Sequence, residues 1–219
     1  MHGAERSSVL VVEDHPIVRD GIRQLIERQP DLHVCGETAE LGTARQLASS
    51  LKPNVVLVDI ALGRENGLDL IRELSASNPE CRIIVLSMYD EATFAERALR
   101  AGARGYVMKH EATETLLVAI RKVLSGGVHL SERASGRLLQ ALVPGRRVRA
   151  ESALAQLTDR EMDVFRLIGT GNTTREIAQS LHVSVKTVES HRQRIKEKLG
   201  MGSTTELIVH AARWVQQGP

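Results

Sequence analysis

Hydrophobic and polar residues follow a repeating order along the chain as far as residue 125. Short apolar runs rich in Val, Ile and Leu alternate with longer stretches in which apolar residues recur at a helical spacing. The short runs are typical of strands buried in a parallel sheet, and the longer stretches indicate amphipathic helices. The predicted strands are Val9–Val12, Leu32–Cys35, Val55–Asp59, Arg82–Leu86 and Gly105–Met108. The predicted helices are Pro16–Arg28, Leu41–Leu51, Leu68–Ser77, Glu91–Ala101 and Glu111–Ser125. Such repeats predict an α/β fold for residues 8–125, a doubly wound five-stranded parallel sheet with helices on both faces.

The pattern changes after residue 125. Residues 126–153 are predicted to form a linker, in which Ser131 caps a short helix. Residues 154–219 carry helical spacing only and predict an all-α domain of four helices. Ser184 caps one helix, and three capping boxes mark the others: Thr158 with Glu161, Thr173 with Glu176, and Ser203 with Glu206. The short turn at 182–184 predicts a helix-turn-helix, the arrangement that places a second helix in the major groove of DNA.

The formal charge is unevenly distributed between these two parts. Residues 1–125 contain 15 Lys+Arg and 18 Asp+Glu, a net of −3, and residues 126–219 contain 14 and 9, a net of +5. This asymmetry suggests that only the second part meets a polyanion. Cys35 and Cys81 are predicted to be buried thiols, which favours a reducing, intracellular setting. With no apolar run of membrane-spanning length, we expect a cytoplasmic protein.

Acidic residues follow two of the predicted strands at the point where each ends. Glu13 and Asp14 follow the first strand, and Asp59 ends the third. The carboxyl ends of parallel strands meet at one sheet edge, which is where open α/β sheets bind ligands. Three neighbouring carboxylates repel one another unless a cation neutralises them, and Mg²⁺ prefers oxygen ligands and meets phosphate oxygens. The sequence therefore indicates phosphoryl chemistry that uses Mg²⁺.

Asp59 is the best candidate for the nucleophile. A carboxylate can attack a phosphoryl group and form an acyl phosphate. Ser87, after the fourth strand, can contact the new oxygens, and Lys109, after the fifth, can supply a cation to them.

Residues 8–125 resemble the receiver domain of bacterial two-component systems, which has a flavodoxin-like fold. The matching residues are Glu13-Asp14, Asp59 at the end of Val-Val-Leu-Val-Asp, Gly67, Ser87, Tyr106 and Lys109. The resemblance implies that Asp59 accepts phosphate from a sensor histidine kinase. It implies that Asp14, Asp59 and the backbone carbonyl of Ala61 bind Mg²⁺, with Glu13 assisting through water, and that Ser87 and Tyr106 form a switch pair. Gly63 departs from the family pattern, which usually has Pro there, and glycine loosens the loop.

The predicted helix that follows Ser184 has an apolar stripe and a polar face. At 100° per residue, Val185, Val188, Ile195 and Leu199 form the stripe that is expected to dock on neighbouring helices. The opposite face carries Lys186, Ser190, Gln193 and Glu197, with Glu189 and Lys196 at one edge and Thr187 and Arg194 towards the other. Lys can read guanine, Gln adenine and Glu cytosine, and Arg192, Arg194, Lys196 and Lys198 suit phosphate contacts.

Residues 157–215 resemble the LuxR-type helix-turn-helix of the NarL/FixJ class of response regulators. The resemblance rests on Leu157-Thr158, Arg160-Glu161, Gly171, Glu176-Ile177-Ala178, Leu181, Val183-Ser184, Lys186-Thr187-Val188, His191 and Lys198-Leu199. It implies that Lys186, Glu189, Ser190 and Gln193 face the bases of double-stranded DNA.

Three functional hypotheses follow from these observations. The first is a DNA-binding transcriptional response regulator that is switched by phosphorylation of Asp59, is not an enzyme, and binds paired half-sites as a homodimer. The second is a Mg²⁺-dependent phosphatase, which would need a second Asp close after Asp59, where the chain has Ile60, Ala61 and Leu62. The third is a regulator that binds DNA constitutively without using phosphate.

Overall fold

The computed structural model describes residues 6–60, 62, 67–88, 91–141 and 153–217 of the chain. The chain divides into two compact units, Met1–Gly136 and Arg137–Pro219. Each unit is described by itself below.

The first unit is built on a parallel sheet. Its five strands are ordered β2-β1-β3-β4-β5, which confirms the prediction of a doubly wound five-stranded sheet. All four strand pairs are parallel. The strands are β1 (Ser7–Val12), β2 (Leu32–Thr38), β3 (Val55–Asp59), β4 (Arg82–Ser87) and β5 (Gly105–Met108). Every residue of β3 is buried, because this central strand is covered on both faces.

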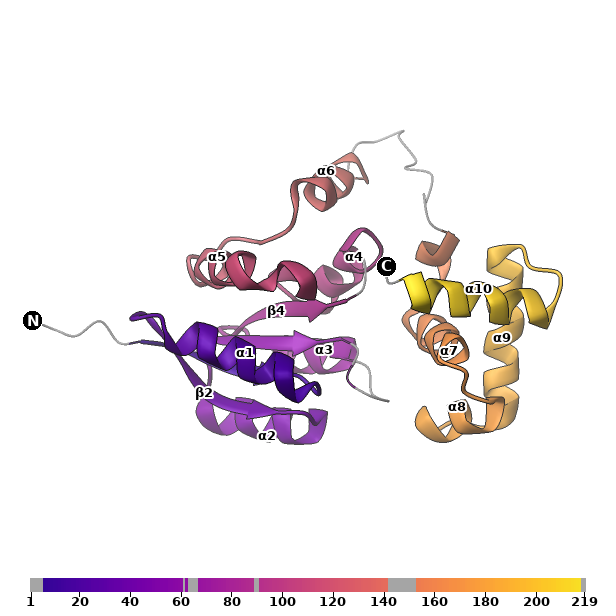
Figure 1. The fold of residues 1–219 in the computed structure, drawn as a ribbon, viewed down its shortest axis with the longest axis horizontal. Coiled ribbons are helices and arrows are strands. Elements are labelled where there is room, and N and C mark those ends of the chain that lie inside the picture. The colour runs from indigo at the N-terminus through magenta and orange to yellow at the C-terminus, as the bar shows by residue number, and fades with distance from the viewer. Residues whose placement is uncertain (1–5, 61, 63–66, 89–90, 142–152, 218–219) are drawn as a thin grey trace, which may run out of the picture. The chain divides into compact units, whose positions relative to one another are not determined.

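Helices cover both faces of the sheet (Figure 1). On one face α1 and α5 pack against side chains such as Val11, Leu57 and Ile84, through Ile26 and Ile120 among others. The other helices, α2, α3 and α4, pack in that order against one another. The helices are α1 (Pro16–Glu27), α2 (Leu41–Leu51), α3 (Gly67–Ser77), α4 (Glu91–Ala101) and α5 (Ala112–Leu124), with a 3₁₀ turn η1 (Lys109–Glu111) before α5. The predicted helices and strands are confirmed, with ends that move by a few residues.

The start of α3 lies against the end of β3. A Cβ atom built on Gly67 would stand 2.5 Å from the carbonyl oxygen of Asp59 and 2.7 Å from the Cα of Ile60. The backbone N–H of Gly67 also donates to the carbonyl of Ile60 at 3.3 Å. Only glycine permits so close an approach of two backbone segments.

The chain that leaves α5 runs beside β5. The N–H of His129 donates to the carbonyl of Arg104 at 2.9 Å, and the N–H of Tyr106 donates to the carbonyl of His129 at 3.0 Å. These bonds form an isolated parallel bridge between Gly105 and His129. Ser131 then caps α6 (Glu132–Ala141), since its hydroxyl accepts the N–H of Ala134 at 3.2 Å. The predicted cap at Ser131 is thus confirmed.

The second unit contains helices only among its described residues (Figure 1). Thr158 and Thr173 each form a complete capping box, as predicted. At the third predicted box the hydroxyl of Ser203 accepts the N–H of Glu206, but the Glu206 carboxylate accepts the N–H of Gly202. The elements are η2 (Ala153–Gln156), α7 (Asp159–Gly169), α8 (Thr174–Ser180), α9 (Val185–Leu199) and α10 (Thr204–Gln217).

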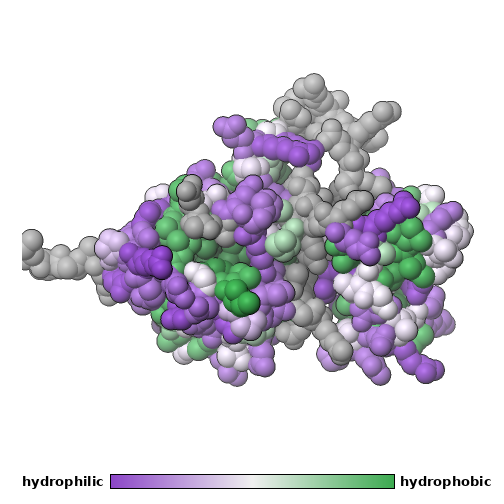
Figure 2. All heavy atoms as spheres, in the orientation of Figure 1, coloured by the Kyte–Doolittle hydropathy of each residue, from purple (hydrophilic) through white to green (hydrophobic). Residues whose placement is uncertain are grey.

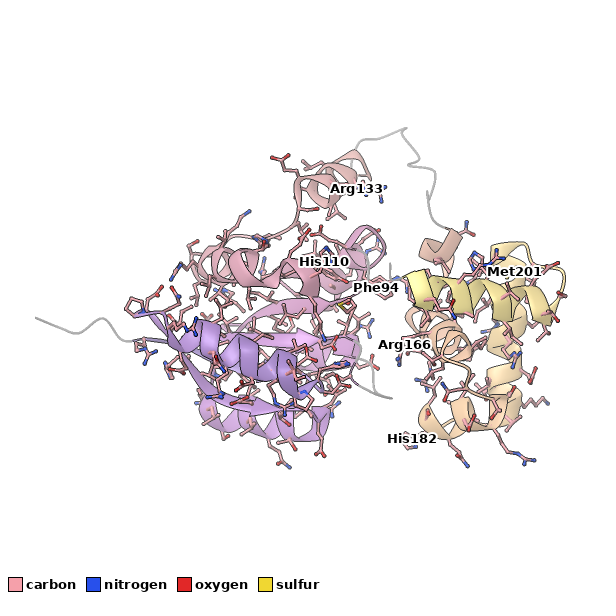
Figure 3. The ribbon with its side chains drawn as sticks, in the orientation of Figure 1. Phe94, His110, Arg133, Arg166, His182 and Met201 are labelled. Carbon is pink, nitrogen blue, oxygen red and sulfur yellow. The ribbon has the colours of Figure 1, made fainter. Side chains whose placement is uncertain are left out.

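The turn between α8 and α9 forms the predicted helix-turn-helix. His182, labelled in Figure 3, takes a left-handed backbone conformation with φ of 51°. The hydroxyl of Ser184 then caps α9 by accepting the N–H of Thr187 at 3.0 Å. Val188 and Ile195 are fully buried against the neighbouring helices.

The predicted apolar stripe of α9 is wrong at one residue, which is not buried. Val185 is 46% exposed, because it is the first residue of α9 and lies beyond the helices that cover the rest of the stripe. Leu199, at the other end, is half-buried.

Hydrophilic residues dominate the visible surface of both units (Figure 2). Cys35 and Cys81 are free thiols, but only Cys81 is buried as predicted, and Cys35 is half-buried near one edge of the sheet in β2. Burial raises the pKa of Cys81 to about 12. None of the described helices is long and apolar enough to cross a membrane.

Candidate functional site

Glu13, Asp14 and Asp59 come together at the carboxyl edge of the sheet. Strands β1 and β3 are neighbours, and Val12 pairs with Val58, so the residues that follow β1 lie beside Asp59. One ligand atom each from Glu13, Asp14, His15 and Asp59 lies within 4.8 Å of the others. Glu13 and Asp59 are buried, at 0% and 1% exposure, and Asp14 is partly exposed. Like charges at such distances repel strongly, especially away from water.

Lys109 partly neutralises this cluster. Its Nζ atom lies 2.8 Å from Oδ2 of Asp59 and 2.7 Å from Oε2 of Glu13. Burial alone would lower the pKa of Lys109, but the contacts with Asp59 and Glu13 outweigh burial and leave its pKa raised. The lysine therefore stays charged, and the three carboxylates still exceed it in charge.

His15 also belongs to the cluster, and the sequence reasoning missed it. Its Nδ1 atom lies 2.8 Å from Oδ1 of Asp14 and 3.0 Å from Oε1 of Glu13. Its backbone N–H donates to the same Glu13 oxygen at 3.0 Å. Its position in the sequence could have indicated this role, because it directly follows the acidic pair and precedes Pro16, the first residue of α1.

Ser87 and Tyr106 occupy the two strands on the far side of Asp59 from β1. Asp59 pairs with Leu86, and Ser87 is the next residue and the last of β4. Tyr106 lies in β5 opposite Val85. Both are buried, at 0% and 2% exposure. Ala61 and Gly63, to which the sequence assigned a metal-binding carbonyl and a loosened loop, lie outside the described residues.

The donor set of the cluster fits a hard divalent cation. Carboxylate oxygens from Glu13, Asp14 and Asp59 are the ligand type that Mg²⁺ prefers, and the cluster carries more negative charge than Lys109 offsets. The Asp14 side chain is 27% exposed, so the cluster is in contact with solvent on that side.

In the second unit, α9 presents a row of exposed polar side chains. Lys186, Glu189, Ser190, Gln193 and Arg194 are exposed, while Thr187, Arg192 and Lys196 are half-buried. The guanidinium of Arg192 donates to the hydroxyl of Thr174 at 2.7 Å, which ties α9 to α8. Lys198 lies 2.6 Å from a buried carboxylate oxygen of Glu161. Residues 153–217 thus combine a stabilised helix-turn-helix with a largely cationic exposed helix.

Comparison with protein families covers both units. Residues 9–121 match the response regulator receiver domain, and residues 155–211 match the luxR family of bacterial regulatory proteins. The chain belongs to the response-regulator family. It is a two-component transcriptional regulator of the NarL/FixJ class, with a receiver domain and a LuxR-type DNA-binding domain.

Full-length relatives match nearly the whole of this response regulator. The oxygen regulatory protein NreC of Staphylococcus haemolyticus is 33% identical over 209 residues, which are 94% of this chain and 96% of that protein. The transcriptional regulatory protein MctR of Rhizobium johnstonii is 33% identical over 203 residues, 93% of this chain and 92% of that protein.

A solved structure resembles both domains of the response regulator. RcsB from Salmonella enterica serovar Typhimurium, bound to the promoter rprA in the presence of phosphomimetic BeF₃⁻, is 26% identical. The match covers 95% of this chain and 99% of that one, with a TM-score of 0.71.

Proposed function

We propose that the response regulator is switched when Asp59 accepts a phosphoryl group from a sensor histidine kinase. The observation that supports this most directly is the position of Lys109, whose Nζ atom contacts both Asp59 and Glu13 inside the carboxylate cluster. A cation held at the nucleophile by a second carboxylate can receive the oxygens of an incoming phosphoryl group.

The chemistry requires little of the protein beyond positioning and charge. A carboxylate oxygen of Asp59 attacks phosphorus, an O–P bond forms, and the P–N bond of the kinase's phosphohistidine breaks. Asp14, Asp59 and the carbonyl of Ala61 would hold Mg²⁺, with Glu13 acting through water, and the ion would screen the charge of the phosphoryl group. Ser87 would then contact the new oxygens, and Tyr106 would move with it as the second member of a switch pair.

The output of the switch is proposed to be sequence-specific binding to double-stranded DNA. Lys186, Glu189, Ser190 and Gln193 would face the bases, with Thr187 at the edge of that face. Arg194 and Lys196 would contact phosphates, and Arg192 would do so only by leaving Thr174. Two copies would bind paired half-sites as a homodimer.

The proposed domain limits are 8–125 for the receiver, 126–153 for the linker and 154–219 for the DNA-binding domain. The proposed site of action is the cytoplasm, because the DNA of a bacterium lies there.

Phosphorylation can be tested by intact-mass spectrometry. The protein is incubated with acetyl phosphate and Mg²⁺, and the wild type is expected to gain one phosphoryl group. Asp59→Asn should abolish the adduct, because the amide is a poor nucleophile. Asp69→Asn is the matched control, since Asp69 is an exposed carboxylate on α3 paired with Arg72. A wild type that gains no adduct, or an Asp59→Asn variant that gains it as readily, would refute the proposed acceptor.

Binding to DNA can be tested by the effect of salt. The full-length protein, treated with acetyl phosphate and Mg²⁺, should bind duplex DNA with an affinity that falls steeply as salt rises, because Lys and Arg displace counterions from phosphates. Lys186→Ala should lower affinity, whereas Lys52→Ala, at the end of α2 in the other unit, should not. Absent binding at low salt, or binding that salt does not weaken, would count against the proposal.

A further inference from the structure

Most polar side chains on the first half of α9 are already hydrogen-bonded within the protein. The hydroxyl of Thr187 lies 2.8 Å from that of Ser184. The hydroxyl of Ser190 donates to the carbonyl of Lys186 at 3.0 Å, and Nε2 of Gln193 donates to Glu197 at 2.9 Å. To contact a ligand, each of these groups must exchange or share a bond that it already makes.

Lys186 and Glu189 are different. Both are exposed, and neither side chain makes a hydrogen bond or ion pair with any residue that the structure describes. At 100° per residue they lie about 60° apart around the helix, with Gln193 between them on the same exposed face. They are the two charged side chains in the first two turns of α9 that are available to a ligand.

A free carboxylate at this position opposes binding to DNA. α9 otherwise carries Lys186, Arg192, Arg194, Lys196 and Lys198, and these cations favour a polyanion. Glu189 is repelled by the phosphates, and it also loses hydration when the helix enters a groove. The carboxylate compensates for this cost only where the DNA offers it a hydrogen-bond donor.

Only one base offers such a donor without an adjacent acceptor. In the major groove guanine and thymine present acceptors at their exposed edges, which repel a carboxylate. Adenine presents its N6 amino donor beside the N7 acceptor, so the second carboxylate oxygen is repelled. Cytosine presents the N4 amino donor alone.

We infer that Glu189 is a specificity-determining residue that selects cytosine, and hence a C·G base pair, in each half-site. This inference rests on the proposed DNA-binding function. Glu189 acts by lowering the affinity for every other base pair at that position, and Lys186 and the phosphate-contacting cations supply the affinity.

The experiment uses the full-length protein treated with acetyl phosphate and Mg²⁺. Duplexes are selected from a randomised pool, and dissociation constants are then measured for the selected duplex and for versions with each base pair replaced. The wild type should require a C·G pair at one position of each half-site, with other pairs there binding about 10-fold or more weakly.

Substitutions of Glu189 should change specificity and affinity in opposite directions. Glu189→Ala should bind all base pairs at that position with similar affinity, and its affinity for the replaced duplexes should rise several-fold, because a repulsive charge is gone. Glu189→Gln should shift the preference towards adenine, since an amide bonds both N6 and N7. A purely structural role for Glu189 would lower affinity for all duplexes together.

Glu197→Gln is the matched control. Glu197 lies about two turns further along α9, so the substitution removes the same charge from the helix. The glutamine keeps an oxygen that can accept the bond from Gln193, so the cytosine preference should remain intact. Selected duplexes with no required C·G pair, or a Glu189→Ala variant as selective as the wild type, would overturn the inference while leaving DNA binding in place. A wild type that binds no duplex at low salt would overturn the proposed function itself.

Discussion

The carboxylate of Glu91 accepts a hydrogen bond of 2.9 Å from the backbone N–H of Ser131. Glu91 is the first residue of α4 and is only 8% exposed, and Ser131 caps α6 in the predicted linker. The N–H of Tyr106 holds the same segment through the carbonyl of His129. The linker is therefore bonded to α4 and to β5, which carries Tyr106, so a rearrangement of either element would change how the linker is held.

Removing the Glu91 carboxylate should release this segment. Glu91→Ala leaves the N–H of Ser131 without its acceptor, and the loss of a buried hydrogen bond costs about 1–3 kcal/mol. Amide hydrogen exchange at 129–131 should become roughly tenfold faster or more than in the wild type. Glu91→Gln keeps an acceptor oxygen, so its exchange rate should lie between those of the wild type and Glu91→Ala. Glu132→Ala, an exposed neighbour in the first turn of α6, is the control. Unchanged exchange in Glu91→Ala would show that the bond does not hold the linker.

Lys109→Ala should destabilise the receiver domain in a manner that Mg²⁺ reverses. The substitution leaves Glu13 and Asp59 buried without their cation, at a cost of about 3 kcal/mol. Thermal unfolding at neutral pH without metal should therefore show a lower Tm, and added Mg²⁺ should raise Tm more in the variant than in the wild type. Lys122→Ala, an exposed lysine on α5, should change neither value. An equal rise in Tm on adding Mg²⁺ to Lys109→Ala and to the wild type would contradict the conclusion that Lys109 partly neutralises the carboxylate cluster.

Glu161 should make the stability of the second unit depend on pH. Burial raises the pKa of this carboxyl, but Lys198 and the hydrogen bonds from Thr158 outweigh burial and leave the pKa lowered from 4.5. A lowered folded-state pKa means that the ionised group stabilises the unit above pH 4.5, and that this contribution is lost as pH falls through the folded-state value.

The variant Glu161→Gln should thus be less stable than wild type at pH 7 by about 1 kcal/mol, and the difference should vanish in acid. Trp214, the chain's one tryptophan, packs in a tilted arrangement against Phe165, with ring centroids 5.6 Å apart, and provides a fluorescence signal for this unit. Glu176→Gln, at the same position of an exposed capping box, is the control. A difference that persists at low pH would argue against the ion pair as its cause.

Gly169→Ala should weaken the packing of α7 on α10. A Cβ at this position would stand 2.5 Å from the carbonyl oxygen of Ala211 and 2.6 Å from a methyl of Val215, so the helices must separate. The expected loss is about 1–3 kcal/mol of unfolding free energy, measured in urea through Trp214. Gly202→Ala meets only Glu206 at 3.8 Å and should cost less than about 0.5 kcal/mol. Equal effects of the two substitutions would mean that the close helix contact is not limiting.

The fold could be predicted because local pattern and global architecture agree. Most of the strands are short apolar runs that alternate with stretches of helical spacing, and Thr158 and Thr173 cap their helices in the way their spacing predicts. Val185 was misplaced because periodicity identifies a face of a helix but not how far the neighbouring helices cover it. The carboxylate of Glu206 accepts the N–H of Gly202 instead of that of Ser203, a one-residue difference that the spacing of the motif does not specify.

The site was predictable to the extent that strand ends define it. Glu13, Asp14 and Lys109 follow the ends of strands and Asp59 is the last residue of one, so the topology alone brings them to one edge. Glu91 and Ser131 are 40 residues apart in the sequence and belong to no common motif. Only the folded backbone shows that the linker returns to β5. Such contacts depend on tertiary packing and leave no periodic signal.

The contact between Gly67 and Asp59 has a consequence for the history of this sequence. Any side chain at position 67 would push against the backbone of Asp59 and Ile60 and displace Asp59, the proposed acceptor. In a lineage that still uses Asp59, substitutions at Gly67 should therefore not be tolerated. A Cβ added at Gly21 would meet nothing within 4 Å, so substitutions there should be tolerated. Replacement of Gly67 in a descendant would therefore disturb the proposed acceptor even where all three carboxylates are retained.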